Sequence, residues 1–114
     1  MTKLQDRRRE YRIKWILVFF DLPTETKKER KAAAKFRKDL QCDGFTMFQF
    51  SIYIRHCASR ENMEVHIKRV HNFLPEHGKV GILYITDKQF GEMQIYYGKK
   101  ADKPKQAALQ LELF

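Results

Sequence analysis

The chain has 114 residues, of which 43% are hydrophobic, so it is long enough for one compact domain and too short for two. Lysine and arginine number 23 against 14 aspartate and glutamate, and the formal charge of +9 favours polyanionic partners; a basic surface that only aids solubility is the alternative. The longest apolar run, residues 15–20, is far shorter than the roughly 20 residues that cross a bilayer, so no membrane span is predicted.

Residues 1–13 form a basic arm with few apolar side chains, and no apolar export signal stands at the start. The two cysteines, Cys42 and Cys57, lack the CxxC spacing of metal and redox sites. We therefore expect a cytoplasmic protein with reduced thiols that pack as small hydrophobic side chains, and a single disulfide is the alternative.

The six apolar residues 15–20 are rich in β-formers and predict a central strand, which Pro23 ends. Thr26 and Glu29 then match a capping box, which predicts a helix over residues 27–42. One side of this helix carries an apolar stripe of Ala32, Ala33, Phe36 and Leu40. The opposite side carries what we call the basic ridge, which consists of Lys27, Lys31, Lys35 and Lys38. An ordinary solvated helix face is the alternative interpretation of these lysines.

After a turn at Asp43-Gly44, residues 45–50 and 51–57 predict two short strands in a hairpin. Ser59 is the expected start of a second helix that ends near Pro75, and its apolar stripe consists of Met63, Ile67, Val70 and Leu74. Further strands are expected at residues 80–86 and 93–97, followed by a lysine-rich linker and an apolar terminus at 109–114.

This order predicts an α+β, ferredoxin-like βαββαβ domain with an extra C-terminal strand. We divide the chain into the arm at 1–13, the domain at 14–98 and a tail at 99–114 that docks on a partner. Both helices should cover one face of the sheet, so the bare face either binds RNA or forms a homodimer. The fifth strand should pair with the partner subunit, because alone it would leave backbone groups unpaired.

Most catalytic patterns are missing from the sequence, including a glycine-rich phosphate loop and an H-E-x-x-H zinc motif. His66 and His71 are five residues apart on the second helix, so we expect surface or core-edge side chains instead of paired metal ligands. Asp21 is the exception, because it follows the central strand directly. Two copies of Asp21 at a dimer axis could bind Mg²⁺, whereas a turn-capping carboxylate is the alternative.

The aromatic side chains of the hairpin suggest a second kind of site. Tyr53 and Phe50 could stack on bases, although a core or dimer role is more common for aromatic residues on such strands. Residues 51–57 do not match the aromatic motif of an RRM domain, so that class is set aside.

Residues 18–30, Phe36-Arg37-Lys38, Gly44-Phe45 and the run Gln49-Phe50-Ser51-Ile52-Tyr53 together resemble the family of CRISPR-associated protein two. The similarity covers most of the chain and is closest to members from single-effector, DNA-cutting CRISPR systems. It implies a homodimer that binds duplex DNA and bridges dimers of the CRISPR integrase, CRISPR-associated protein one, during spacer integration. It also implies a magnesium-dependent endonuclease on DNA or single-stranded RNA, with Asp21 as the metal ligand.

Two main hypotheses follow: a non-catalytic DNA scaffold, which the lysine and arginine excess favours, and a metal-dependent phosphodiesterase that uses Asp21. A toxin-like, metal-dependent ribonuclease of the same fold is a third. The predicted nucleic-acid contacts lie on the first helix: Lys27, Lys28, Arg30, Lys31, Lys35, Arg37 and Lys38. The predicted partner contacts lie near the C-terminus, where a frayed tail is the alternative: Ile95, Tyr97, Leu109, Leu111, Leu113 and Phe114.

Overall fold

The computed structural model describes residues 12–101 of the chain. Its main sheet is antiparallel, with the strand order β2-β3-β1-β4. The strands are β1 (Ile13–Asp21), β2 (Thr46–Gln49), β3 (Ile52–His56) and β4 (Lys79–Thr86). This is the predicted α+β, ferredoxin-like arrangement, and it places β1 in the middle of the sheet between β3 and β4.

The first helix, α2 (Lys27–Cys42), begins and ends where the sequence predicts. Thr26 Oγ1 accepts from the backbone N–H of Glu29, and the Glu29 carboxylate accepts from the N–H of Thr26, so the capping box is present. At the other end, the N–H groups of Gly44 and Phe45 donate to the last free carbonyls of the helix. Gly44 has φ +90°, a conformation that a side chain would strain, so glycine is required there.

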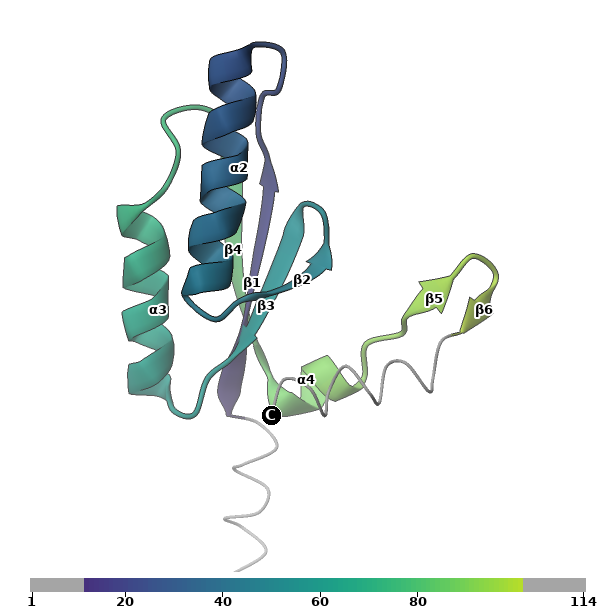
Figure 1. The fold of residues 1–114 in the computed structure, drawn as a ribbon. Coiled ribbons are helices and arrows are strands. Elements are labelled where there is room, and N and C mark those ends of the chain that lie inside the picture. Colours follow the sequence, from purple (N-terminus) through teal and green to yellow (C-terminus); the bar gives the residue numbers. More distant parts are fainter. Residues whose placement is uncertain (1–11, 102–114) are drawn as a thin grey trace, which may run out of the picture.

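The second helix, α3 (Arg60–Asn72), is capped by the Ser59 side chain as predicted. It ends before Leu74, whose side chain is exposed instead of completing the apolar stripe. Both helices cover the same face of the sheet (Figure 1). The core between helices and sheet consists of Ile16, Val18, Phe20, Phe36, Leu40, Phe45, Tyr53, Cys57, Met63 and Val70.

The region after β4 differs from the prediction. A short helix, α4 (Asp87–Gly91), follows the strand directly, and Thr86 and Gln89 form its capping box. The strand expected over residues 93–97 is reduced to β5 (Tyr96–Tyr97), which pairs with β6 (Lys100–Ala101) of its own chain. The fifth strand is therefore not isolated, and the β5–β6 hairpin stands away from the main sheet (Figure 1).

Among residues 12–101, the second face of the sheet is covered at one end only. Side chains at alternate positions of β1, Trp15, Leu17 and Phe19, point to this face, because their neighbours Ile16, Val18 and Phe20 lie in the helix-side core. Here α4 covers Trp15, while Phe19 remains exposed. Within the described residues, no helix is long and apolar enough to span a membrane.

Candidate functional site

Asp21 lies at the open end of this second sheet face. It is the last residue of β1, and its register partner across the sheet is Lys79 of β4. Both residues border a hollow of about 340 Å³ whose other lining residues are Phe19, Phe20, Ser51, Ile52 and Gly81. The Phe19 ring lies over Gly81 so closely that an added Cβ would come within 2.5 Å of it. The glycine therefore keeps this end of the face flat and accessible.

The Asp21 carboxylate is exposed and makes no hydrogen bond or ion pair with another of residues 12–101. The predicted location at a central strand end is confirmed, but the predicted alternative, a carboxylate that caps the turn, has no contact to support it. Mg²⁺ is usually held by one or two carboxylates together with phosphate oxygens and water. Across residues 12–101, no three His, Cys, Asp or Glu side chains gather into a metal-binding group. One copy of the chain thus offers a single carboxylate.

The basic ridge of α2 is exposed along its whole length. Lys35 Nζ contacts Asp39 Oδ2 at 2.8 Å, so part of its charge is neutralised within the helix. Arg30 has a structural role, because its Nη1 donates to the carbonyls of Thr24 and Glu25 in the loop before α2. The remaining ridge lysines form no ion pair with described residues: Lys27, Lys31 and Lys38.

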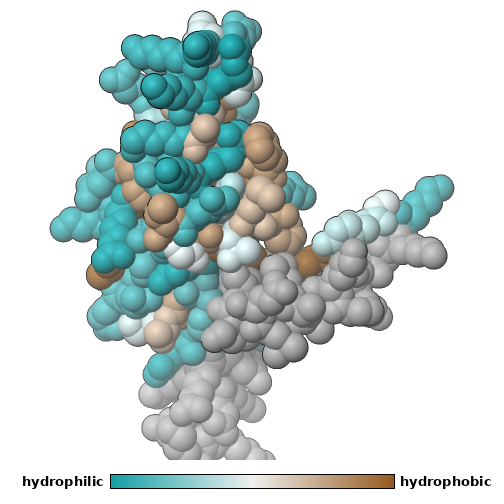
Figure 2. Space-filling view, in the orientation of Figure 1, coloured by the Kyte–Doolittle hydropathy of each residue, from teal (hydrophilic) through white to brown (hydrophobic). Residues whose placement is uncertain are grey.

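Arg37 leaves the helix surface and turns toward the β2–β3 hairpin. Its guanidinium carbon lies 3.7 Å from the centroid of the Phe50 ring, and its Nε donates to the Phe50 carbonyl at 3.4 Å. Tyr53 is buried in the core, which confirms the commoner role expected for it, whereas Phe50 is not a core residue. In Figure 2 apolar side chains gather over this hairpin, beside the hydrophilic surface of α2.

A buried polar network on the helix side has no signal in the sequence. His66, expected at the surface or core edge, is buried, and its Nδ1 donates to Asp43 Oδ2 at 2.8 Å. Because that nitrogen carries the proton, Nε2 accepts from Arg55 at 2.9 Å. Arg69 donates to the other oxygen of Asp43 at 3.0 Å. The network joins the end of α2 to β3 and α3. Two of its residues, Asp43 and Arg69, also line a surface hollow of about 340 Å³ beside the end of α2.

The two cysteine thiols differ in their exposure to solvent. Cys57 is buried, as expected, and burial raises the pKa of its thiol, which keeps it protonated and unreactive. Cys42 is exposed, so the prediction that both cysteines pack as hydrophobic side chains is wrong for this residue. Both cysteines are free, and the alternative of a single disulfide is therefore excluded.

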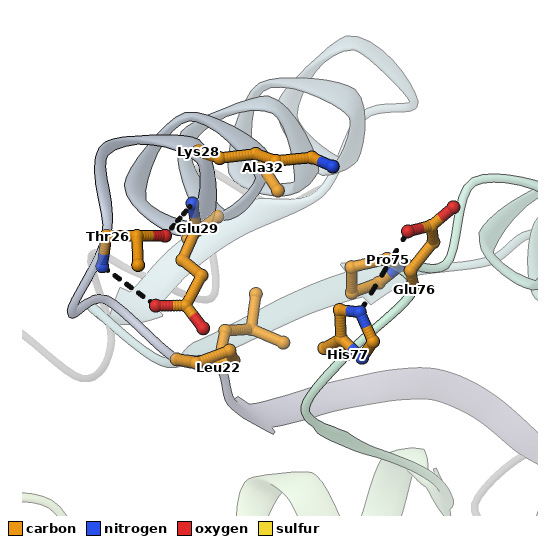
Figure 3. A pocket seen from close by; sticks show the side chains of 10 residues that line it. Leu22, Thr26, Lys28, Glu29, Ala32, Pro75, Glu76 and His77 are labelled. Atoms are coloured by element: carbon orange, nitrogen blue, oxygen red, sulfur yellow. Dashed lines mark hydrogen bonds and ion pairs between the residues drawn. The ribbon is translucent and has the colours of Figure 1, made fainter.

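A groove of about 470 Å³, larger than the hollow beside Asp21, lies between the start of α2 and the loop after α3. Figure 3 shows Leu22, Ala32 and Pro75 facing it, with Glu29 and His77 at its edges. The Glu29 carboxylate is engaged by the hydrogen bond from the Thr26 backbone N–H, which lowers the pKa of Glu29. It therefore stays ionised as a helix cap and is unsuited to act as a general acid.

Two of the six predicted partner-binding residues lie within the described part of the chain. Ile95 is half-buried just before β5, and Tyr97 is exposed within it. Four others lie outside the described residues: Leu109, Leu111, Leu113 and Phe114. The basic N-terminal arm lies outside them too, except for Arg12 and Ile13.

Comparison with known proteins gives a consistent match. Residues 14–93 match the family described as CRISPR associated protein Cas2. A protein of Flavobacterium psychrophilum named CRISPR-associated endoribonuclease Cas2 is 69% identical, and the match covers 92% of this chain and 91% of that relative. Proteins of the same name from Parvibaculum lavamentivorans and Ligilactobacillus salivarius are 56% and 42% identical. Those matches cover 88% and 82% of this chain, and 99% and 92% of the relatives.

Proposed function

The chain belongs to the CRISPR-associated protein Cas2 family, and from this premise we propose that it is a dimeric, nucleic-acid-binding subunit of CRISPR adaptation. The observation that carries the proposal is the row of exposed lysines on α2, which, apart from Lys35, form no ion pair with an acidic residue of the described part of the chain. Such a row suits the evenly spaced phosphates of duplex DNA, because it recognises charge without reading base edges.

The dimer in this proposal forms through the open half of the second sheet face. Phe19 and Leu83 are exposed there, and large apolar side chains of this kind favour burial against another surface. Two copies that pack through this face would carry two α2 helices on their outer sides, which doubles the number of phosphate contacts. Ile95, Tyr97 and the apolar residues of the tail are proposed to dock on the partner subunit or on the CRISPR integrase, so that the dimer bridges integrase dimers.

A pair of charge variants tests the DNA-binding role. Replacing Lys31 and Lys38 by Gln should weaken binding to duplex DNA of any sequence. It should also reduce the slope of log affinity against log salt by up to about 1.8, since each phosphate contact contributes about 0.9. The matched control replaces Lys68 of α3 and Lys88 of α4, which removes the same charge from elsewhere. Equal slopes for the two double variants would contradict a binding role of the ridge.

Hydrolysis of RNA is a second candidate function, which the names of the relatives favour. Asp21 lies on the face proposed for dimerisation, so two copies would contribute two carboxylates near the dimer axis. That pair matches the oxygen ligands that Mg²⁺ prefers, and the ion when bound would polarise a phosphodiester and activate water. In this arrangement Asp21 holds the ion, and Lys79, its neighbour across the sheet, attracts the phosphate.

The Asp21→Ala variant separates the two candidates. We expect it to lose magnesium-dependent RNA cleavage while it still supports spacer integration by the reconstituted integrase complex. Glu25→Ala is the matched control, because Glu25 is another exposed carboxylate in the loop that follows β1. Cleavage that persists in Asp21→Ala would exclude Asp21 as the ligand. Loss of integration by the folded variant would contradict the scaffold role.

A further inference from the structure

Phe50 occupies an unusual location for a large aromatic side chain. It lies in the turn between β2 and β3, and 67% of its surface is exposed, the largest value among the exposed large hydrophobic residues of the described chain. Met47 of β2 is also exposed, so two large apolar side chains of this hairpin face solvent, and we call them the hairpin patch. A ring this exposed gains little hydrophobic free energy on folding, so packing in the core does not explain a large aromatic residue at this position.

The exposed ring is held in place. The Arg37 guanidinium lies against it at 3.7 Å and is 5.9 Å from the centroid of the Phe20 ring, which belongs to the core. The Arg37 Nε hydrogen bond to the Phe50 carbonyl fixes the guanidinium to the turn as well. A cation that covers one face of an aromatic ring leaves the rest of that ring available to a ligand, already oriented.

The surroundings of the ring indicate what the ligand is. Lys38, the residue after Arg37, is exposed, and the ridge lysines continue along the same helix, so the patch borders a strongly positive surface. A flat aromatic ring beside cations is the combination that binds single strands, in which bases stack on the ring and phosphates contact the cations. Bases of a duplex are already stacked on one another and do not reach such a ring.

The turn is also tied to the strand that carries Asp21. The backbone N–H of Phe20 donates to the carbonyl of Ser51 at 3.0 Å, and Ser51 lines the hollow beside Asp21. Phe50 therefore immediately precedes a residue of that hollow in the chain. A strand whose base stacks on Phe50 would run along the edge of the sheet toward the end of β1.

We propose that Phe50, supported by Arg37, is a base-stacking position for an unpaired nucleobase of single-stranded RNA or DNA. The inference rests on the proposed function only in requiring that the chain binds nucleic acid. It adds a contact to bases, and hence a preference for unpaired strands, to a surface otherwise built for phosphates. A protein that covers the patch is the competing occupant, and the test below distinguishes it.

The test uses the full chain with Asp21→Ala, so that no strand is cleaved, and measures fluorescence anisotropy of labelled strands about 16 nucleotides long. The probes are oligouridine RNA, oligothymidine DNA, an abasic DNA strand of equal length and a duplex. Phe50→Ala should weaken binding of both base-bearing single strands by about 5- to 150-fold, the loss of one stacked base. It should leave the abasic strand and the duplex unchanged, and Phe50→Trp should restore the single-strand affinity.

Met47→Ala is the matched control, since it removes an exposed apolar side chain from the same hairpin without touching the Arg37 contact. An equal effect of Phe50→Ala and Met47→Ala would overturn the inference. So would an equal loss on the abasic strand, or a parent protein that binds base-bearing single strands no better than the abasic strand. If the parent protein shows no preference for base-bearing strands but binds the duplex, the proposed function stands and only the stacking inference fails. A parent protein that binds no probe would contradict the proposed function and the stacking inference.

Discussion

The two ends of β1 differ in how far their side chains on the second sheet face are buried. At the first end Trp15 is 1% exposed: Phe90 of α4 stacks on its indole at 3.7 Å, and the indole Nε1 donates to Asp87 at 2.7 Å. At the second end Phe19 is 45% exposed, and Asp21 has no partner among the described residues. One strand therefore combines a closed end that stabilises the fold with an open end that is available to a partner or ligand.

The difference shows how a small domain separates stability from function. The closed end is covered by α4 and by Met93, which follows it. A helix of five residues such as α4 is too short to be stable without its packing on Trp15. Within residues 12–101 nothing covers the open end, because the chain after α4 leads away into the β5–β6 hairpin (Figure 1). The predictions below test whether substitutions at the two ends have different consequences.

The largest effect is expected from Phe90→Ala. Loss of this buried ring leaves a cavity against Trp15, so the free energy of unfolding should fall by about 3–5 kcal/mol. Phe19→Ala removes the same side chain from the open end of the same face and should cost less than about 1 kcal/mol, because the ring is half exposed. Urea denaturation of dilute protein, followed by circular dichroism, measures both. Similar losses for the two variants would remove the distinction between the ends.

A smaller effect is expected from Asp87→Ala. The substitution removes the acceptor of the indole hydrogen bond and the ion pair with Lys14 at 3.7 Å, so a loss of about 1–3 kcal/mol follows. Asp87→Asn keeps an acceptor oxygen for Trp15 and should lose less. If the two variants are equally stable in urea denaturation, the indole hydrogen bond does not contribute as described.

The smallest effect concerns pH and His56, which packs edge-on against Trp15 at 4.8 Å. Burial lowers the pKa of His56 below its ordinary 6.5; Lys14 and Arg55 lower it further, and Asp87 opposes them. The unfolded chain therefore binds a proton more readily, so stability is full above about pH 6.5 and falls as the pH drops toward the lowered pKa. His56→Gln should show a shallower fall in melting temperature between neutral and acidic pH, and an unchanged pH dependence would refute this role.

Sequence patterns predicted the elements that have local signals. The capping box and the Asp43-Gly44 turn gave both ends of α2, and the strand before Pro23 placed Asp21. Helix α4 was not predicted, because five residues show no helical period, although Thr86 and Gln89 repeat the capping pattern and could have indicated it. The expected strand at 93–97 begins later because Met93 packs into the cluster around Trp15.

Contacts between distant residues could not be predicted in the same way. Asp43 and His66 are 23 positions apart, and only the packing of α3 beside the end of α2 brings them together. Arg37 was predicted to contact nucleic acid as part of α2, but its stacking on Phe50 depends on where the β2–β3 hairpin lies. These are tertiary contacts, for which neither periodicity nor spacing provides a signal.

Both candidate functions require a second copy of the chain on the open half of the sheet face, so the association state is the most direct test. Leu83→Glu places a charge in that half, and Tyr84→Glu places the same charge on the opposite side of β4; the two residues are 48% and 47% exposed. In sedimentation equilibrium the wild-type protein and Tyr84→Glu should be dimers, while Leu83→Glu should be a folded monomer. A wild-type monomer, or a Leu83→Glu variant that dimerises like the wild type, would contradict the account.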